Sequence, residues 1–321
     1  LLGGGHANVQ VLKKLCMHHY EGLHTVLINN AGRAIYSGMT PGYIQGEFDL
    51  NEIAIDLQRL CYNADSTFID DYVIGINEHF QRIDLKDHPP IFYDVLSINT
   101  GSLSRNTNIK IHKKANCFPV KPISELVYKI KLIDELVETL SNPTINLVGG
   151  GVAAYELCFA LRQRYTRKIL FNIISDVHLS EKNLNSKTIN KMKSISKEMK
   201  INEIKGSVSH ILPNEIKLSN GKSIKSNLCL LSTGAELPQW LLNSKLEKIN
   251  GYLAVNEKLQ CLNHENIFAT GDVASLKRYD RPKSGVMAVR QGEILRENLF
   301  YKLQNKTLKK YKPQTNWLYI I

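Results

Sequence analysis

Gly3-Gly4-Gly5-His6-Ala7-Asn8 opens the chain, and the spacing of its glycines decides the fold. The same Gly-x-Gly spacing returns in Gly149-Gly150-Gly151-Val152-Ala153-Ala154, and Thr270-Gly271-Asp272 follows near the end. Where a strand turns into a helix, glycines let backbone N–H groups approach a pyrophosphate at the helix N-terminus. One such turn is a weak signal. Two in one chain, followed by Thr-Gly-Asp, predict that the chain binds two dinucleotides.

The length and composition are typical of a soluble protein with two domains. At 321 residues the chain fits two domains of roughly 150 residues each. A hydrophobic content of 43% and a charged content of 22% are ordinary for globular proteins. No apolar run approaches the roughly 20 residues that span a bilayer. The chain begins at Leu1 without Met, so we expect a few residues to precede it, and no signal peptide is indicated.

Cysteine spacing and net charge limit the chemistry. The six cysteines form neither a C-x-x-C nor a C-x-x-x-x-C pattern, so we predict no metal site and no redox disulfide. The net charge of +11 has two readings: an anionic partner, or a bias toward Lys, Asn and Ile, visible in Ser186–Lys205 and Lys302–Lys312. We favour the bias and predict no nucleic-acid partner, because the basic stretches are not interleaved with aromatic residues.

The two halves of the chain share one internal order. Each reads β-α-β, then a helix, a β-meander and a strand that ends in Thr-Gly, at Thr100-Gly101 and again at Thr233-Gly234. This alternation predicts an α/β fold with two Rossmann-like dinucleotide-binding domains, the second inserted into the first, each with a β-meander. We place the first domain at residues 1–118 and 250–321 and the second at 119–249. Asn220-Gly221 predicts a hairpin with a type I′ turn.

The first glycine turn departs from the usual fingerprint at two positions. Its candidate binding residues are Gly3, Gly5, His6 and Ala7. Asn8 stands where a Gly or Ala normally lets helix and strand pack closely, so we expect the helix to sit slightly off or to tilt at its start. Asn29 stands where an acid normally binds the adenosine ribose. An amide can still hydrogen-bond a ribose, and Arg33 can lie over the adenine or meet a phosphate.

The second turn fits the fingerprint. Its candidate binding residues are Gly149, Gly151, Val152, Ala153 and Gly234. Glu156 follows on the helix, where this arrangement often places a carboxylate toward the nicotinamide. Asp176 is the candidate ribose acid, which would repel a 2′-phosphate and favour NADH. Ser175 beside it could instead contact a 2′-phosphate, and a surface Asp without a ligand is a further reading.

Thr270-Gly271-Asp272 indicates a flavin. Gly271 permits a tight turn under the cofactor, and Asp272 can accept hydrogen bonds from a ribityl chain. Arg281–Gln291 opens the last helix, whose N-terminus carries roughly half a positive charge. At the N1–C2 oxygen edge of a flavin this charge would stabilise the anionic reduced form. Lys283, Gly285 and Val286 are the candidates there, and a solvated helix end is the alternative.

In this order the motifs resemble the pyridine nucleotide-disulfide oxidoreductase superfamily across essentially the whole chain. Without a cysteine pair, the chain is more similar to type II NADH dehydrogenases than to disulfide reductases. Four blocks resemble one subgroup, the NADH-dehydrogenase-like flavoproteins found alone or fused ahead of selenide, water dikinase: Gly3–His6, Tyr36–Gly42, Tyr93–Asn99 and Pro282–Gly292.

The resemblance implies FAD in the first domain and NAD(P)H in the second. Carried over residue by residue, it assigns FAD to Gly3, Gly5, His6, Arg33, Ser37, Gly38, Val73, Thr100, Gly101, Asp272 and Val286. It implies an NAD(P)H oxidoreductase that passes electrons to a quinone or another small acceptor, such as a selenium or sulfur species, and names no catalytic residue.

The resemblance also implies further polypeptide after Trp317–Ile321, as a fused domain or as a segment that contacts a membrane. We expect a cytoplasmic enzyme, with a peripheral position at the inner face of a membrane as the other possibility. The alternative function is a nucleotide-binding accessory module of low turnover that serves selenium metabolism.

Overall fold

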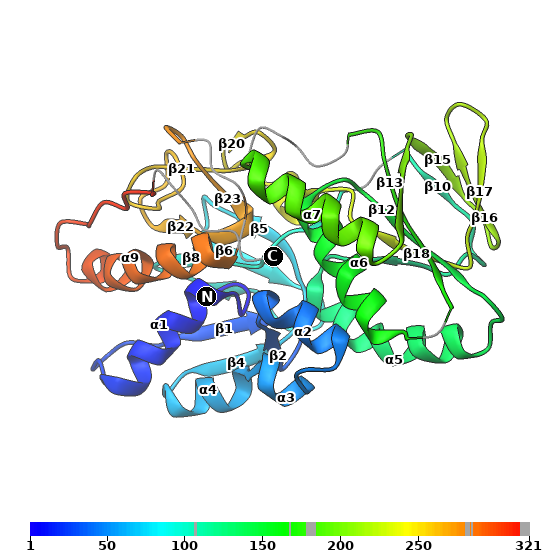
Figure 1. Ribbon diagram of the computed structural model, residues 1–321. Helices are drawn as coiled ribbons and strands as arrows, with labels where there is room; N and C mark the ends of the chain where they lie inside the picture. Colours follow the sequence, from blue (N-terminus) through cyan, green and yellow to red (C-terminus); the bar gives the residue numbers. More distant parts are fainter. Residues whose placement is uncertain (106–107, 167, 178–183, 280–282, 284, 315–321) are drawn as a thin grey trace. The chain divides into compact units, whose positions relative to one another are not determined.

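The structure, a computed structural model, describes residues 1–314 apart from 106–107, 167, 178–183, 280–282 and 284. Its contacts divide the chain into two units (Figure 1). The first comprises Leu1–Tyr36, Ala54–Leu103 and the described residues from 236 onward; the second comprises Ser37–Ile53 and Ser104–Ala235. The assignment of one dinucleotide to each domain stays a prediction. The predicted tail at 317–321 lies outside the described residues.

A parallel sheet forms the centre of the first unit, in the order β22-β8-Leu2-β1-β4. Its strands are β1 (Val26–Asn29), β4 (Thr67–Asp70), β8 (Leu96–Ile98) and β22 (Ile267–Ala269). Leu2 bridges both Ile28 and Ile98, so it takes the place of the central strand. Because these strands are parallel, the residues that follow them in the sequence meet at one edge of the sheet.

Two helices, a meander and several short elements complete the first unit. Helix α1 (His6–Met17) packs against α9 (Gly285–Leu303), and a Cβ on Gly292 would lie only 3.0 Å from Ala7 Cα. The predicted meander is present as the antiparallel strands β5 (Val73–Asn77), β6 (Arg82–Leu85) and β7 (Ile91–Phe92). The remaining elements are β2 (Arg33–Ile35), β3 (Ala54–Asp56), α4 (Leu57–Asn63), α8 (Gln239–Leu242), β20 (Lys248–Ile249), β21 (Tyr252–Val255), the 3₁₀ turn Gly271–Val273 and β23 (Ala274–Leu276).

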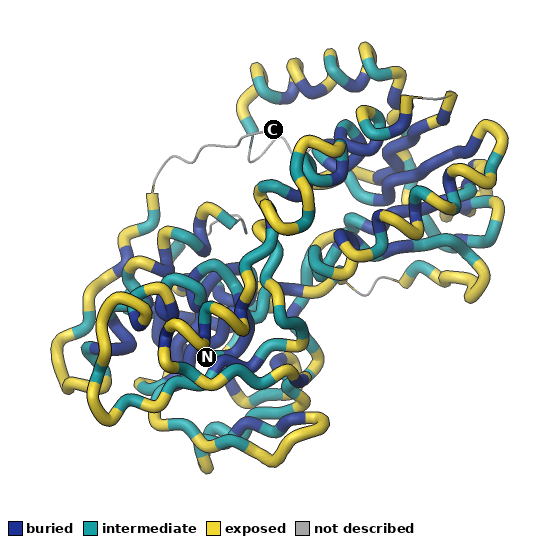
Figure 2. Tube along the Cα trace, turned by 90° about the horizontal axis from the view of Figure 1, so that it is seen from below, coloured by how far each residue is buried: buried dark blue, intermediate teal, exposed yellow. Residues whose placement is uncertain are grey.

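The second unit is built on a five-stranded parallel sheet in the order β11-β18-β12-β13-β14. Its strands are β11 (Cys117–Pro119), β12 (Thr144–Val148), β13 (Leu170–Ser175), β14 (Ile201–Lys205) and β18 (Leu228–Leu231). One face packs in an apolar cluster with α5 (Ile123–Glu138), α6 (Val152–Arg164) and α7 (Ser186–Glu198). The other face packs under β10 (Lys110–Ile111), β15 (Val208–Ile211), β16 (Glu215–Leu218) and β17 (Ser223–Lys225). Burial in Figure 2 follows this layering, and the α/β class with a meander in each half is confirmed.

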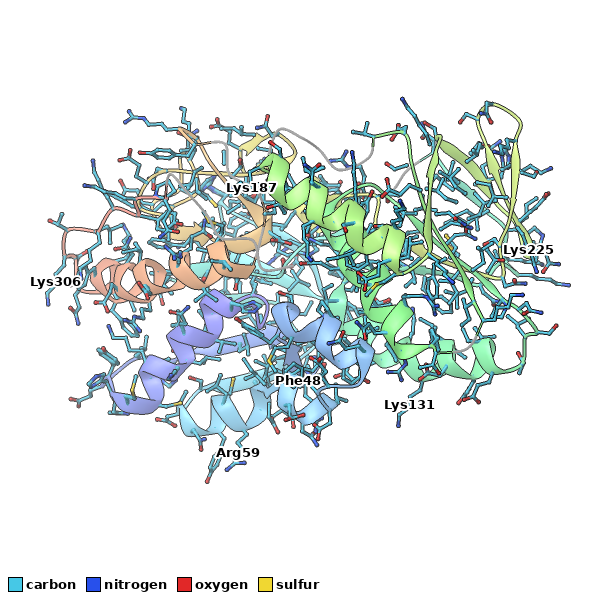
Figure 3. All side chains as sticks on the ribbon, in the orientation of Figure 1. Phe48, Arg59, Lys131, Lys187, Lys225 and Lys306 are labelled. Carbon is cyan, nitrogen blue, oxygen red and sulfur yellow. The ribbon has the colours of Figure 1, made fainter. Side chains whose placement is uncertain are left out.

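One row of side chains crosses the second sheet from edge to edge. Strand register places Cys117 beside Cys229, Cys229 beside Asn146, and Asn146 beside Asn172, with Asn202 at the end. Asn172 Nδ2 donates to Asn146 Oδ1 at 2.8 Å, and Asn202 Nδ2 donates to Asn172 Oδ1 at 3.0 Å. Asn146 Nδ2 in turn donates to the carbonyl of Lys225, labelled in Figure 3, at 3.1 Å. A polar row therefore lies within an otherwise apolar layer, and its amides satisfy one another.

The segment Ser37–Ile53 was expected in the first domain but packs with the second unit. It contains a 3₁₀ turn (Ser37–Met39), α2 (Thr40–Gln45) and α3 (Leu50–Ile53). Ile44 is buried in the cluster that α5 and α6 form. Arg164 holds the segment by donating to the Ile44 carbonyl at 2.7 Å while it pairs with Asp134 at 2.6 Å. This contact was not predicted, because Arg164 lies 120 positions from Ile44 in the sequence.

The hairpin predicted at Asn220-Gly221 joins β16 and β17, but the predicted type I′ turn is wrong. A type I′ turn needs positive φ at both central residues. Only Gly221 has it, at +85°, and its N–H donates to the Leu218 carbonyl. The loop thus has three residues and ends in a left-handed glycine, which is the next most common hairpin connection.

Candidate functional site

The first glycine turn runs directly along the end of strand β8. Gly3 has φ +82°, and a Cβ there would lie 2.5 Å from Thr100 Cα. A Cβ on Gly5 would overlap the side chain and carbonyl of Asn99. Larger residues are therefore excluded at both positions, and the turn brings the start of α1 to the Asn99-Thr100-Gly101 segment.

The Asn99 side chain links three segments at this edge of the sheet by hydrogen bonds. Its Oδ1 accepts from the backbone N–H of Ala7 at 3.0 Å and of Asn8 at 3.4 Å, and its Nδ2 donates to the Thr270 carbonyl at 2.8 Å. One buried amide thus joins the helix start, strand β8 and the Thr-Gly-Asp segment. This role of Asn99 was not predicted from the sequence.

Asn8 explains how the turn tolerates a residue larger than Gly or Ala. It is fully buried, and its Nδ2 donates to the carbonyls of Leu2 at 3.1 Å and Gly3 at 2.8 Å. Its Oδ1 accepts from the Ser97 hydroxyl at 2.6 Å. The side chain therefore replaces close helix–strand packing with hydrogen bonds to the strand end. Close packing of α1 is found instead against α9, at Gly292.

The Thr-Gly-Asp segment lies at the same edge. The Gly271 N–H donates to Gln291 Oε1 at 2.7 Å, so α9 fixes the turn. Asp272 Oδ2 accepts from the Ser102 hydroxyl at 3.1 Å. Burial lowers the pKa of His6 while the nearby Asp272 carboxylate opposes the shift, so the imidazole is neutral at pH 7. The structure brings His6, Asp272 and the Thr100 segment together as predicted; Ser102 and Gln291 were not foreseen.

Asn29 and its neighbours are placed differently from the ribose site that the sequence suggested. Asn29 Oδ1 accepts from the Gly4 N–H at 2.9 Å, and its Nδ2 donates to the Ala31 carbonyl at 2.7 Å. The amide therefore holds the glycine turn itself. Arg33 is exposed on β2, and Val73 is half-buried at the start of β5. A ribose role for Asn29 and a contact for Arg33 or Val73 remain predictions.

Two polar atoms at this edge test whether the residues fit a bound dinucleotide. Nε2 of His6 and Oγ1 of Thr100 are buried without a hydrogen-bond partner among the described residues. A buried polar atom left unpaired costs about 1–3 kcal/mol. A Cβ added to Gly101 would meet no described atom within 4 Å. Unpaired polar atoms beside open space fit a ligand rich in phosphate and hydroxyl oxygens, as FAD is.

The start of α9 carries the remaining first-unit candidates. The Lys283 ammonium donates to the Ala274 carbonyl and lies 4.2 Å from the centre of the Tyr252 ring. Gly285 begins the helix, and Val286 is exposed on it. Arg281 and Pro282 of the predicted block lie outside the described residues. Ser37 and Gly38 belong to the second unit, so the first unit does not gather them.

The second glycine turn repeats the geometry of the first. Gly149 has φ +138°, and a Cβ there would overlap the Ser232 carbonyl. A Cβ on Gly151, by contrast, would meet no described atom within 4 Å. Val152 and Ala153 open α6 directly after it, so their N–H groups belong to the helix N-terminus. Gly234 follows β18, and its carbonyl accepts from the Arg105 N–H at 3.2 Å.

The acids of the second unit differ in environment. Glu156 is half-buried on α6, and burial raises the pKa of its carboxyl to about 7. Asp176 is exposed after β13 and accepts from the Ser207 hydroxyl at 3.2 Å. The Ser175 hydroxyl donates to the Val177 carbonyl at 2.7 Å and accepts from its N–H at 3.2 Å. Asp176 is therefore presented outward, while Ser175 is engaged in the local turn.

Basic residues spread over both units. Lys131, Lys187, Lys225 and Lys306 are exposed on α5, on α7, on β17 and after α9, respectively (Figure 3). No three metal-ligating side chains of His, Cys, Asp or Glu gather within the described ranges. Of the helices that the structure covers, none has both the length and the apolar character needed to cross a bilayer.

Residues 1–292 match the pyridine nucleotide-disulphide oxidoreductase family. The chain belongs to this family. Its members are flavin-dependent NAD(P)H oxidoreductases that bind FAD and NAD(P)H, and the chain is an enzyme of this class. The predicted superfamily, the fold class and the two cofactors are thereby confirmed.

The chain is similar to several known proteins, although the sequence identity is low. Ferroptosis suppressor protein 1 of Xenopus tropicalis is 27% identical over 264 residues, which cover 77% of this chain and 66% of the frog protein. The chain thus spans about two thirds of that relative's length. The water-forming NADH oxidase of Lactobacillus brevis, solved with NADH, superposes with a TM-score of 0.79 at 18% identity, covering 97% of this chain and 70% of the other. NDH2 of Plasmodium falciparum, also solved with NADH, has a TM-score of 0.71 at 18% identity, with 86% and 64% covered.

Proposed function

We propose that the chain is an NADH-dehydrogenase-like FAD-dependent oxidoreductase that takes electrons from NADH in preference to NADPH. In this proposal it delivers them to a quinone or another small acceptor without a disulfide relay. The observation that carries the proposal is the unpaired His6 and Thr100 atoms beside the first glycine turn, together with a second turn that is open at Gly151. Each turn has the features that a pyrophosphate site needs.

The first unit holds FAD in this proposal. Backbone N–H groups at the start of α1 bind the pyrophosphate, Thr100 and His6 donate to ligand oxygens, and Asp272 accepts from the ribityl hydroxyls. The positive end of α9, with Gly285 and Val286, faces the flavin edge where negative charge collects. When bound, FAD supplies acceptance of a hydride from a nicotinamide and release of its electrons to an acceptor.

The second unit holds the nicotinamide nucleotide. The N–H groups that open α6 bind its pyrophosphate, with Gly151 leaving the space for it. Asp176 accepts from the adenosine ribose, and its negative charge repels a 2′-phosphate. Ser175 supports the preference for NADH because its hydroxyl hydrogen already bonds the Val177 carbonyl. Glu156, with its raised pKa, carries a proton near neutral pH and can donate a hydrogen bond to the carboxamide of the nicotinamide.

We place the chain in the subgroup that occurs alone or fused ahead of selenide, water dikinase, on the strength of the four sequence blocks. In this placement a quinone, or a selenium or sulfur species, accepts the electrons, and a fused domain or a membrane surface is the proposed partner. The cytoplasm, or the inner face of a membrane, is the proposed location.

Two substitutions separate the two sites. Asp272→Ala removes charge-assisted hydrogen bonds worth about 1.5–3 kcal/mol, so FAD should bind roughly 10- to 150-fold more weakly. Asp87→Ala, at an exposed acid of the same unit, is the control and should leave FAD affinity unchanged. Gly151→Val should keep FAD and the thermal midpoint, since a Cβ there clashes with nothing, yet flavin absorbance should no longer fall when NADH is added without oxygen.

The same measurements can refute the proposal. A purified protein that shows no flavin absorbance and takes up no FAD on reconstitution is not this enzyme. Equal loss of FAD in Asp272→Ala and Gly151→Val would show that the two sites are assigned wrongly. Binding of both cofactors with only trace reduction of quinones and dyes would point to the accessory module instead.

A further inference from the structure

Two cysteines that lie far apart in the sequence are direct neighbours in the second sheet. Cys117 on β11 and Cys229 on β18 are register partners in a parallel pair. Register partners point to the same face of a sheet, and both residues pack in the cluster under the meander. The Cys229 N–H also donates to the Asn116 carbonyl at 2.8 Å, so the two strands are held in this register beside the thiols.

The spacing suits a covalent bond between the sulfurs. Neighbouring strands lie about 4.8 Å apart. A disulfide needs Cα atoms about 4.4–6.8 Å apart with Cβ atoms on the same side. The general strand spacing falls within this Cα range, and the register places both Cβ atoms on one side of the sheet. This pairing was not predicted, because Cys117 and Cys229 lie far apart in the sequence and only local cysteine spacing is visible there.

The two thiols differ in accessibility and acidity. Cys117 is half-buried, whereas Cys229 is completely buried. A hydrogen bond from the Cys229 thiol lowers the pKa of Cys117 in spite of burial. The same contact and burial raise the pKa of Cys229. Cys117 is therefore the more accessible and the more acidic of the two thiols, and Cys229 lies buried beside it.

We propose that Cys117 and Cys229 form a reversible oxidative modification site, in which hydrogen peroxide converts the two thiols into a disulfide that joins β11 to β18. The site is separate from electron transfer to the acceptor and needs neither FAD nor NADH.

The reaction balances in two steps. The Cys117 thiolate attacks one peroxide oxygen, so that an S–O bond forms, the O–O bond breaks and hydroxide leaves as water after taking up a proton. The Cys229 sulfur then attacks the Cys117 sulfur, so that the S–S bond forms, the S–O bond breaks and a second water leaves with the Cys229 proton. Two thiols lose two electrons, and the peroxide gains them.

The test treats the whole protein, with its cofactor bound, with a small excess of hydrogen peroxide and maps its cysteines by mass spectrometry. The expected product has lost two hydrogen masses, contains a cross-linked peptide pair carrying Cys117 and Cys229, and returns to the starting mass with dithiothreitol. Cys261, which is buried in the first unit, is the internal reference and should stay reduced. Alkylation after unfolding should find two thiols fewer than in untreated protein.

Two variants assign the roles. Cys229→Ser should leave the Cys117 intermediate without its partner, so that added glutathione is captured on Cys117. Cys117→Ser should block the reaction, because Cys229 is out of reach of the oxidant. Each variant is isosteric, and an unchanged thermal midpoint shows that it folds. Full alkylation of both cysteines after peroxide, or a cross-link that joins other cysteines such as Cys16 and Cys61 instead, would overturn the proposal.

Discussion

Replacing Asn99 by Ala should loosen the first unit where strand β8, helix α1 and the Thr-Gly-Asp segment meet. The side chain accepts from the Ala7 and Asn8 N–H groups and donates to the Thr270 carbonyl. The substitution leaves buried groups without partners, each costing about 1–3 kcal/mol. For the two well-formed bonds, to Ala7 and Thr270, we expect a total loss of about 2–6 kcal/mol, a large share of the 5–15 kcal/mol that is typical of folded proteins.

Amide hydrogen exchange is the appropriate assay, because the two units need not unfold together. In Asn99→Ala the amides of α1 should exchange faster by roughly one and a half to four decades, since about 1.4 kcal/mol corresponds to a factor of ten. The second unit should keep its protection. Asn30→Ala, at an exposed residue after the neighbouring strand, is the matched control.

Asn99→Asp keeps the acceptor oxygen of the side chain and removes its donor, so it tests the two roles separately. It keeps an oxygen for the two N–H groups at the positive end of α1 but no longer donates to the Thr270 carbonyl. Its loss of protection should therefore fall between wild type and Asn99→Ala. If Asn99→Ala slows or leaves unchanged the exchange of α1, or costs less than about 1 kcal/mol, the assignment of Asn99 as the joint between these segments is refuted.

Three further substitutions probe other features. Burial raises the pKa of Glu156 to about 7 from 4.5, so ionisation of its carboxyl destabilises the fold as pH rises through that range. Above pH 7, Glu156→Gln should therefore be more stable than wild type by about 1–3 kcal/mol and should have the higher thermal midpoint. Near pH 4.5 the two midpoints should match. Burial alone would raise the pKa of Asp71, but hydrogen bonds from His88 and from backbone N–H groups lower it to about 2. That stabilisation is complete above pH 3.8 and is lost as pH falls toward 2, so Asp71→Asn should lower the midpoint at pH 6 and flatten its decline in acid. Asn8→Leu keeps the branched shape of the side chain but leaves the Leu2 and Gly3 carbonyls without their donor, and should lower stability by about 2–4 kcal/mol in denaturant titrations.

The parts of the fold that the sequence predicted are those with a local cause. A glycine turn must lie between a strand and a helix, so Gly3–Gly5 and Gly149–Gly151 located both sheets. Thr270-Gly271-Asp272 located the end of β22 in the same way. These signals occupy a few consecutive residues, and their backbone requirements hold wherever the segment packs.

The residues that the sequence could not reveal act over long separations. Asn99 bonds Ala7, 92 positions away, and Thr270, 171 positions away. Gln291 accepts from the Gly271 N–H although it lies 20 positions further along the chain, inside the last helix. Asn29 looked like a weakened ribose ligand because its own strand end was visible, while its bond to the Gly4 N–H was not. A single sequence shows which residues can hydrogen-bond but not which of them the chain brings together.

The hydrogen-bonded amides of Asn146, Asn172 and Asn202 disfavour misaligned strands while the second unit folds. Strands such as β12 and β13 are rich in branched apolar residues, so a slip by two positions keeps the same face inward and is hardly penalised by the hydrophobic effect alone. Such a slip would set Asn146 opposite Leu170 or Ile174 instead of Asn172. Each buried amide that loses its partner costs about 1–3 kcal/mol. The amides that are hydrogen-bonded in the native register would therefore be unpaired in a shifted one. They favour a single register among several that bury the same amount of apolar surface.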